Sequence, residues 1–206
     1  MHTAIKLPLQ SLNPVLVRDL QERYPSAQLH IVVEAPPAGT GMMTEDCFWD
    51  IIGQLDWSKE ANDDIIAPAA QALSQYAEQD IRQFSEILAR KLYDLDGERF
   101  AKELAPEEAY SEEEHAHFSV DIFLYARCCV IANGWEYYEQ VLKDPTMMIK
   151  GYTFESLLYL DSEAWKIKTG QEDYFQYTEY WYEAFNNPDG WPGIIPLKDR
   201  IIGKQG

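Results

Sequence analysis

The residues best suited to metal chemistry are His115 and His117, which follow Glu112, Glu113 and Glu114. Imidazole nitrogens and carboxylate oxygens together bind zinc and other divalent ions. In a β-strand a His-x-His pair presents both rings on one side, whereas in a loop the spacing fixes no geometry. The pattern favours a solvated acidic loop, and a metal-dependent hydrolase that uses these two histidines and nearby carboxylates is the alternative.

Other catalytic patterns are missing from the sequence. It contains no Gly-x-Ser-x-Gly elbow, no Walker loop, no Gly-x-Gly-x-x-Gly and no zincin or Cys-x-x-Cys deaminase spacing. Cys47 lies beside Glu45 and Asp46, whereas a reactive thiolate is favoured by a positively charged setting.

Paired carboxylates are numerous, for example Asp63 with Asp64 and Asp94 with Asp96. A catalytic pair needs an apolar pocket that separates its two pKa values, and a solvated helix surface explains each pair equally well. No catalytic residue and no cofactor is therefore assigned from the sequence.

Arg127 is a lone cation in the most apolar stretch of the chain, residues 123–131. A buried arginine requires a carboxylate partner, and Asp121 is six residues earlier and so on another face of a helix. We expect a structural ion pair with a more distant acid, with contact to an anionic ligand as the alternative. The neighbouring Cys128 and Cys129 are interpreted as small core residues in a reducing compartment.

The densest aromatic cluster of the chain lies in residues 174–185. On a helix, Tyr174, Tyr177, Trp181 and Phe185 share one face, whereas Tyr180 and Tyr182 do not. Two interpretations remain open. The segment packs as a terminal helix, or its Tyr and Trp residues, mixed with Glu, grip a cationic partner.

The net charge of the 206-residue chain is −18, and residues 41–121 alone carry −14. Such a field favours basic protein partners and disfavours binding of nucleic acid through its phosphates. No apolar run approaches the roughly 20 residues that span a bilayer, and the first residues do not resemble a signal peptide. We therefore expect a cytoplasmic protein that does not bind membranes.

The sequence pattern predicts that these residues are positioned by a mainly α fold with a small N-terminal α+β unit. Residues 1–35 read as strand–helix–strand, 36–41 as a linker, 42–185 as a helical domain and 186–206 as an irregular tail. Thr44 and Ser119 are expected N-caps, and Gly134 and Gly170 are expected helix stops. Helices are predicted near 44–55, 62–73, 81–95, 119–133, 135–142, 153–169 and, less regularly, 174–185. Pro68 is expected to bend the second of these or to move its start later.

Several blocks of sequence occur in an order that resembles a bacterial family known as a domain of unknown function, DUF4240. These blocks are residues 43–52, 56–58, 84–96, 123–128 and 137–142. The resemblance covers roughly residues 43–170 and leaves out the first 40 residues and the aromatic tail. It implies a mostly helical domain in a soluble bacterial protein, and it brings no catalytic motif.

The charge, the acidic middle and the lack of a catalytic pattern favour a non-enzymatic acidic binding protein. We expect an inhibitor or immunity-type protein that occludes a basic effector or toxin. A regulatory or scaffold module, in which residues 1–40 dock elsewhere, is a further alternative. No oligomeric state is predicted. The residues expected to bind the partner are Asp63, Asp64, Asp94, Asp96, Glu112, Glu113, Glu114, Tyr177, Tyr180, Trp181 and Tyr182.

Overall fold

The computed structural model describes Tyr24 and residues 43–104 and 119–192. The chain divides into two units, Met1–Ala35 and Pro36–Gly206, and the second unit holds all of the described residues except Tyr24. The expected strand–helix–strand unit, the linker at 36–41, the acidic run Glu112–Glu114 with His115 and His117, and residues 193–206 of the tail lie outside the described residues.

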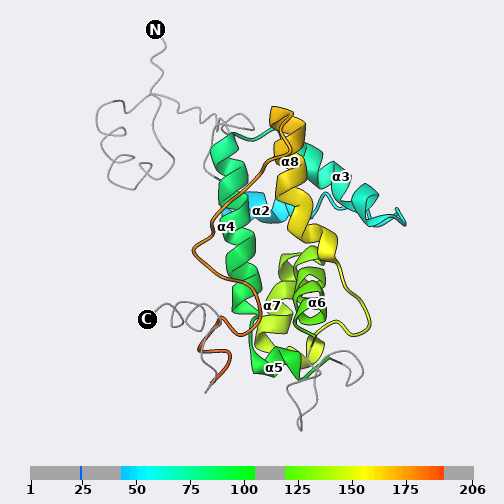
Figure 1. Ribbon diagram of the computed structural model, residues 1–206, viewed down its shortest axis with the longest axis vertical. Coiled ribbons are helices and arrows are strands. Elements are labelled where there is room, and N and C mark those ends of the chain that lie inside the picture. The colour runs from blue at the N-terminus through cyan, green and yellow to red at the C-terminus, as the bar shows by residue number, and fades with distance from the viewer. Residues whose placement is uncertain (1–23, 25–42, 105–118, 193–206) are drawn as a thin grey trace. The chain divides into compact units, whose positions relative to one another are not determined.

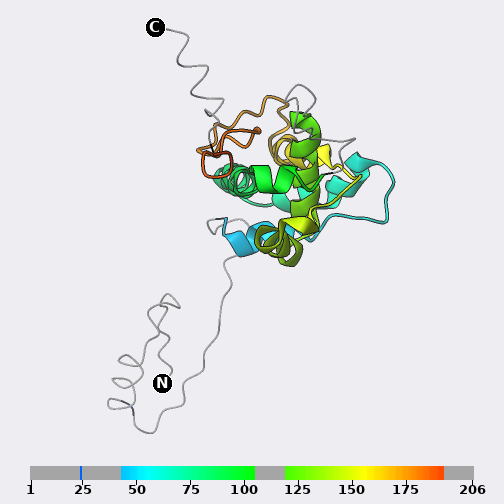
Figure 2. The same ribbon diagram turned by 90° about the horizontal axis from the view of Figure 1, so that it is seen from below.

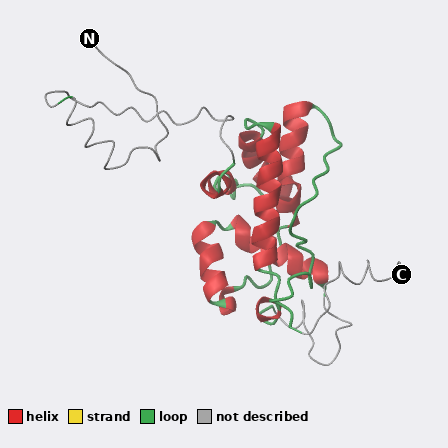
Figure 3. Cartoon of the chain, turned by 90° about the vertical axis from the view of Figure 1, so that its left-hand side faces the viewer, coloured by secondary structure: helices red, strands yellow, loops and turns green. Residues whose placement is uncertain are grey.

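The described residues form seven α-helices and two short 3₁₀-helices and contain no strand, so the expected mainly α fold is confirmed for this part (Figures 1 and 3). None of these helices is both long and apolar enough to cross a lipid bilayer. In chain order the elements are α2 (Glu45–Ile52), α3 (Asn62–Leu73), α4 (Glu78–Asp94), α5 (Glu98–Ala101), α6 (Val120–Ala132), α7 (Trp135–Lys143), η3 (Pro145–Met147), η4 (Glu155–Tyr159) and α8 (Leu160–Thr169).

The predicted helix ends match local hydrogen bonds. The hydroxyl of Thr44 accepts from the N–H of Cys47 at 3.2 Å, and that of Ser119 accepts from the N–H of Ile122 at 3.2 Å. Each fills one of the donors that a helix leaves free at its start. Gly170 ends α8 in the left-handed region at φ 71°, which costs glycine little. α3 begins at Asn62, so the later start considered for Pro68 is wrong and the proline lies inside the helix.

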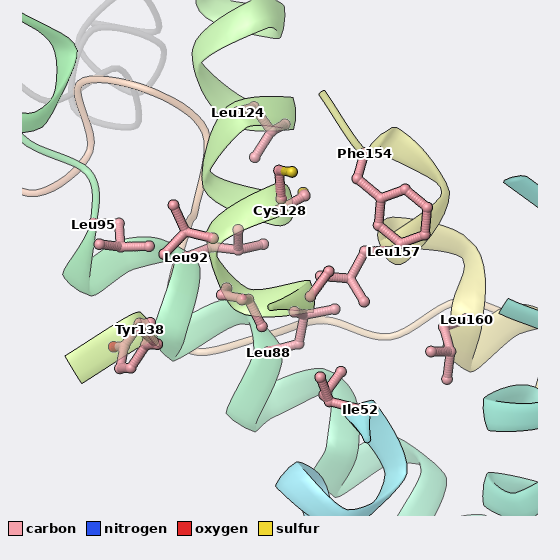
Figure 4. Close-up of a cluster of buried hydrophobic side chains, with 14 of the residues drawn as sticks. Ile52, Leu88, Leu92, Leu95, Leu124, Cys128, Tyr138, Phe154, Leu157 and Leu160 are labelled. Atoms are coloured by element: carbon pink, nitrogen blue, oxygen red, sulfur yellow. The ribbon is translucent and has the colours of Figure 1, made fainter. Parts of the chain in front are cut away.

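The core forms where α4 and α6 face each other, with α2, α7, α8 and η4 around them (Figure 4). Leu88, Leu92 and Leu95 approach from the α4 side, and Leu124 and Cys128 approach from α6. Nine of the 13 residues of α6 are buried, so its apolar surface is covered almost all round, as its sequence indicates. Truncating one of these leucines to alanine costs about 2–5 kcal/mol in such a core.

Two of the predicted helices are wrong in part or in full. The helix expected at 153–169 begins only at Leu160, because residues 155–159 form a 3₁₀ turn after the N–H of Phe154 bonds the carbonyl of Tyr125 at 3.1 Å. The helix expected at 174–185 is absent. Residues 171–192, which we call the strap, form bends and turns outside any helix. The last of the described helices, α8, therefore ends at Thr169.

Candidate functional site

The strap runs beside α4, as both ribbon views show (Figures 1 and 2), and Asp96 fixes its end. The fully buried Asp96 carboxylate accepts from the backbone N–H groups of Phe185 (3.1 Å), Asn186 (2.8 Å) and Asn187 (3.0 Å). It also accepts from the indole Nε1 of Trp191 at 2.6 Å. Asp96 therefore cannot present its charge to a partner in this structure, and its assignment as a partner-binding residue is corrected to a structural one.

The backbones of Gly97 and Gly190 approach each other closely beside this contact. The N–H of Glu98 donates to the carbonyl of Gly190 at 2.9 Å. A Cβ on Gly190 would lie 2.1 Å from the carbonyl oxygen of Asp96, a backbone atom that cannot rotate away. Position 190 therefore accepts only glycine if the strap is to reach Asp96.

Arg127 is fully buried on α6, as its setting indicates, but its partners differ from those expected. Its Nη1 donates to the carbonyl of Leu92 at 2.9 Å, and its guanidinium lies 4.5 Å from the centre of the Phe123 ring. Among the described residues no carboxylate is within ion-pair distance, and Nε and Nη2 have no hydrogen-bond partner. Burial lowers the pKa of Arg127, and the charge of Asp96 at longer range opposes that shift.

The middle of the strap is held by Arg82 and Glu86 on α4. Arg82 donates through Nη1 to the carbonyl of Phe175 at 3.2 Å and to Oε1 of Gln176 at 3.1 Å. Glu86 accepts from the amide of Gln176 at 3.3 Å and from the backbone N–H of Glu179 at 3.0 Å. These side chains satisfy strap backbone groups that a helix would have paired internally, which explains why the segment is not helical.

The start of the strap is held by a buried polar cluster. The hydroxyl of Tyr174 lies 2.7 Å from Oγ of Ser85, which donates to the carboxylate of Asp161 on α8. Burial raises the pKa of Asp161, whereas its hydrogen bonds with Ser85 and with the N–H of Ser162 lower it. Burial also raises the pKa of Tyr174 to about 12. The cluster is therefore uncharged at low pH and carries a buried carboxylate above the raised pKa.

The outer side of the strap is acidic and aromatic. The strap contains no lysine or arginine, and its exposed acids are Glu172, Asp173, Glu179, Glu183 and Asp189. Phe175 is 69% exposed, Tyr177 is 78% exposed and Trp181 is 43% exposed. Tyr180 and Tyr182 are half-buried. The Tyr180 ring lies 5.2 Å from that of Tyr93, and burial raises the pKa of Tyr182 to about 12.

About half of the described acids outside the strap lie in the first turn of a helix. Every described α-helix carries an acid in its first turn, where negative charge stabilises the helix dipole. Asp63 and Asp64 are exposed and belong to this class. Asp94 is half-buried and accepts from the hydroxyl of Tyr138 at 3.1 Å. The strap acids lie outside any helix, and Glu172 pairs with Lys166 at 3.0 Å.

A cleft of about 440 Å³ opens at a second place, where α3 begins and α6 ends. Trp57, Tyr152 and Phe154 line it together with the polar side chains of Asn62, Asn133 and Thr153. The rings of Trp57 and Phe154 lie 5.1 Å apart. Figures 1 and 2 place the start of α3 and the strap on opposite sides of the fold, so these are separate surfaces.

Among the described residues, metal ligands do not gather at either surface. In residues 43–104 and 119–192 no three His, Cys, Asp or Glu side chains come together in a way that would hold an ion. Cys128 and Cys129 are buried free thiols, and burial raises the pKa of Cys129 to about 11, which disfavours the thiolate.

Residues 43–184 match a family described as "Protein of unknown function (DUF4240)". The match confirms the resemblance over residues 43–170 and extends it into the strap, which lies beyond the blocks of sequence that first indicated the family. No curated protein and no solved structure matches the chain.

Proposed function

Because the chain belongs to the DUF4240 family, whose description assigns no activity, we propose a function from the chain's own surface: a non-enzymatic acidic binding protein that occludes a basic protein. The proposed partner is an effector or toxin of the same bacterial setting, and the mode of action is that of an inhibitor or immunity protein. The observation that carries the proposal is the strap, with five exposed acids, three exposed aromatic rings and no cation of its own.

Exposed charge supports the proposal beyond the strap. The described residues expose twice as many acids as bases. The exposed acids are Glu45, Asp46, Asp50, Glu60, Asp63, Asp64, Glu78, Asp121, Glu136, Asp144, Glu163, Glu172, Asp173, Glu179, Glu183 and Asp189; the exposed bases are Lys59, Arg90, Arg99, Lys102, Lys143, Lys150, Lys166 and Lys168. A negative field of this kind speeds the encounter with a cationic partner, and its effect falls as salt rises.

The exposed rings supply binding energy that the charged side chains alone do not. Exposed ion pairs contribute only about 0–1 kcal/mol each, whereas aromatic anchors that become buried at interfaces contribute about 2 kcal/mol or more. Phe175, Tyr177 and Trp181 project from a segment whose backbone Asp96, Glu86 and Arg82 hold in place. Such fixed rings lose little conformational freedom on binding.

The test is to capture basic proteins from the source bacterium on the full-length chain, to purify the captured protein and to measure its affinity by calorimetry at several salt concentrations. We expect the affinity to fall steeply with salt. We also expect Glu179→Gln with Glu183→Gln to weaken binding about tenfold, because about 1.4 kcal/mol of complementary charge is removed.

The matched control is Glu78→Gln with Glu136→Gln, which removes the same charge from exposed positions outside the strap. A second pair compares Trp181→Ala with Trp135→Ala, which is 52% exposed on α7. Equal losses within each pair would show that the strap is not the docking surface. Affinity that is indifferent to salt would refute the proposed function.

A further inference from the structure

The cleft between the start of α3 and the end of α6 is lined by aromatic rings and uncharged polar side chains, and Cys129 and Ile149 complete the lining. Trp57 is 52% exposed and Tyr152 is 72% exposed, although both border a hollow of about 440 Å³. The ring of Trp57 packs on that of the buried Phe154, with 5.1 Å between centroids and 48° between planes. Rings set at an angle around a hollow present π faces to whatever enters it.

The charges around the cleft favour a positive occupant. None of the described residues that line it is charged. In sequence, Asp56 precedes Trp57 and Glu155 follows Phe154. The nearby Lys59 is already matched by Asp56, with 4.0 Å between the charged atoms, and Lys150 lies 3.9 Å from Glu103. Asp56, Glu103 and Glu155 therefore outnumber Lys59 and Lys150 by one, so the local excess of charge is negative. Desolvated cations gain most from π faces in such a field.

The two helix ends at the cleft act in the same direction. α6 ends there at its C-cap, Asn133, and no basic residue in its last turn offsets the negative end of its dipole. α3 begins there with Asn62, and its positive end is offset by Asp63 and Asp64 in its first turn. The cleft therefore lies at the negative end of one helix dipole and at a positive end that two carboxylates offset.

From these observations we infer that the aromatic cleft binds the guanidinium or alkylammonium side chain of a basic polypeptide. The rings of Trp57 and Tyr152 stack on the flat cation, and the amide oxygens of Asn62 and Asn133 and the hydroxyl of Thr153 accept its N–H groups. The choice of a basic polypeptide rests on the proposed function, but the cleft is a site of its own, on the side of the fold away from the strap.

The cleft is tested with two small probes of the same shape, N-acetyl-L-arginine amide and its uncharged analogue N-acetyl-L-citrulline amide. The full chain is labelled with ¹⁵N-tryptophan, and Trp57→Phe and Trp135→Phe assign two of the indole signals. Trp57 and Trp135 are both 52% exposed, so each reports the same degree of solvent contact. We expect arginine amide to shift the Trp57 signal saturably and to leave Trp135 unmoved. Citrulline amide is expected to bind about tenfold more weakly, because it lacks the cation.

The variant that checks the site is Tyr152→Ala, because Tyr152 is mostly exposed and its removal leaves the core intact. It should weaken arginine amide about tenfold, whereas Trp135→Ala should not change it. Equal shifts of Trp57 and Trp135, equal binding of the two probes, or an unaffected Tyr152→Ala variant would each overturn the inference.

These outcomes separate the cleft from the strap. Only the inference about the cleft fails if a basic protein binds through the strap with salt dependence while arginine amide does not shift the Trp57 signal selectively. The proposed function fails alone if arginine amide binds the cleft as expected while no basic protein is captured.

Discussion

Asp96 is the residue on which the end of the strap depends. Its buried carboxylate pairs three backbone N–H groups and the indole of Trp191, so removing it leaves several buried donors without an acceptor. We expect Asp96→Ala to lower the free energy of unfolding by about 3–5 kcal/mol, measured by urea denaturation. The exposed Asp50 on α2 gives the control, and Asp50→Ala should change stability by less than about 0.5 kcal/mol. Similar effects of the two substitutions would contradict the structural role of Asp96.

Asp161 predicts a pH dependence whose sign follows from its burial. Its pKa is raised above the ordinary value of 3.8, so the folded chain holds a proton that the unfolded chain releases. The stability that this group contributes is therefore full below about pH 3.8 and falls as pH rises to the raised pKa of the folded state. In Asp161→Asn, the amide can donate to Ser85 and accept from Ser162, and this loss disappears.

Urea denaturation between acid and neutral pH measures the effect. The stability of Asp161→Asn relative to the natural chain should rise with pH and then level off. Asp50→Asn, an exposed carboxylate on α2, serves as the control and should leave the pH profile unchanged. Parallel profiles for the natural chain and Asp161→Asn would mean that Asp161 is charged at no cost in the folded state.

At the scale of the element, α3 contains a flaw that the sequence shows. Pro68 lies inside the helix and has no N–H to donate to the carbonyl four residues earlier. Interior proline costs a helix about 3 kcal/mol, and its stiffening of the unfolded chain returns about 0.4–1 kcal/mol. We expect Pro68→Ala to raise the free energy of unfolding by about 2–3 kcal/mol.

The same substitution elsewhere supplies the control for α3. Pro145 stands at the first position of η3, where a proline has no hydrogen bond to lose and its φ already fits. Pro145→Ala should therefore leave stability unchanged or lower it. A gain of equal size at both positions would show that the helix interior is not the cause.

Local signals predict most of the helices, because the signals and their partners are close in sequence. Thr44 bonds a residue three positions away, and Ser119 does the same. The prediction of a helix in the strap is wrong for the opposite reason. Its spacing of rings fits a helix face, but its backbone is paired by Glu86 and Asp96, about 90 residues earlier, and no local pattern shows such partners.

The two surfaces differ in how far the sequence could indicate them. Composition suggests a binding role for Tyr177 and Trp181 as one of two interpretations, and the structure leaves both side chains exposed. Asp96 has the same composition-based assignment and is buried instead, because a charge pattern does not report which carboxylates pair internally. The cleft has no signal in the sequence, since Trp57, Asn133 and Tyr152 come from three separate segments that only the fold brings together.

At the scale of the whole molecule, a net charge of −18 implies that the folded chain repels itself. The attractive pairs in the described part of the chain include Lys143 with Glu139 and Lys166 with Glu172, which are largely exposed and contribute little. Added sodium chloride screens repulsion and attraction alike, so the larger repulsion decides whether salt raises or lowers stability.

We expect the urea midpoint to rise as sodium chloride increases and to level off above about 0.15 M, where the screening length has fallen to about 8 Å. The chloride salt is used because sulfate strengthens apolar burial by a separate route. A midpoint that falls over the same range would show that ion pairs outweigh the surplus of acids, and it would remove the excess field on which the attraction of a basic partner depends.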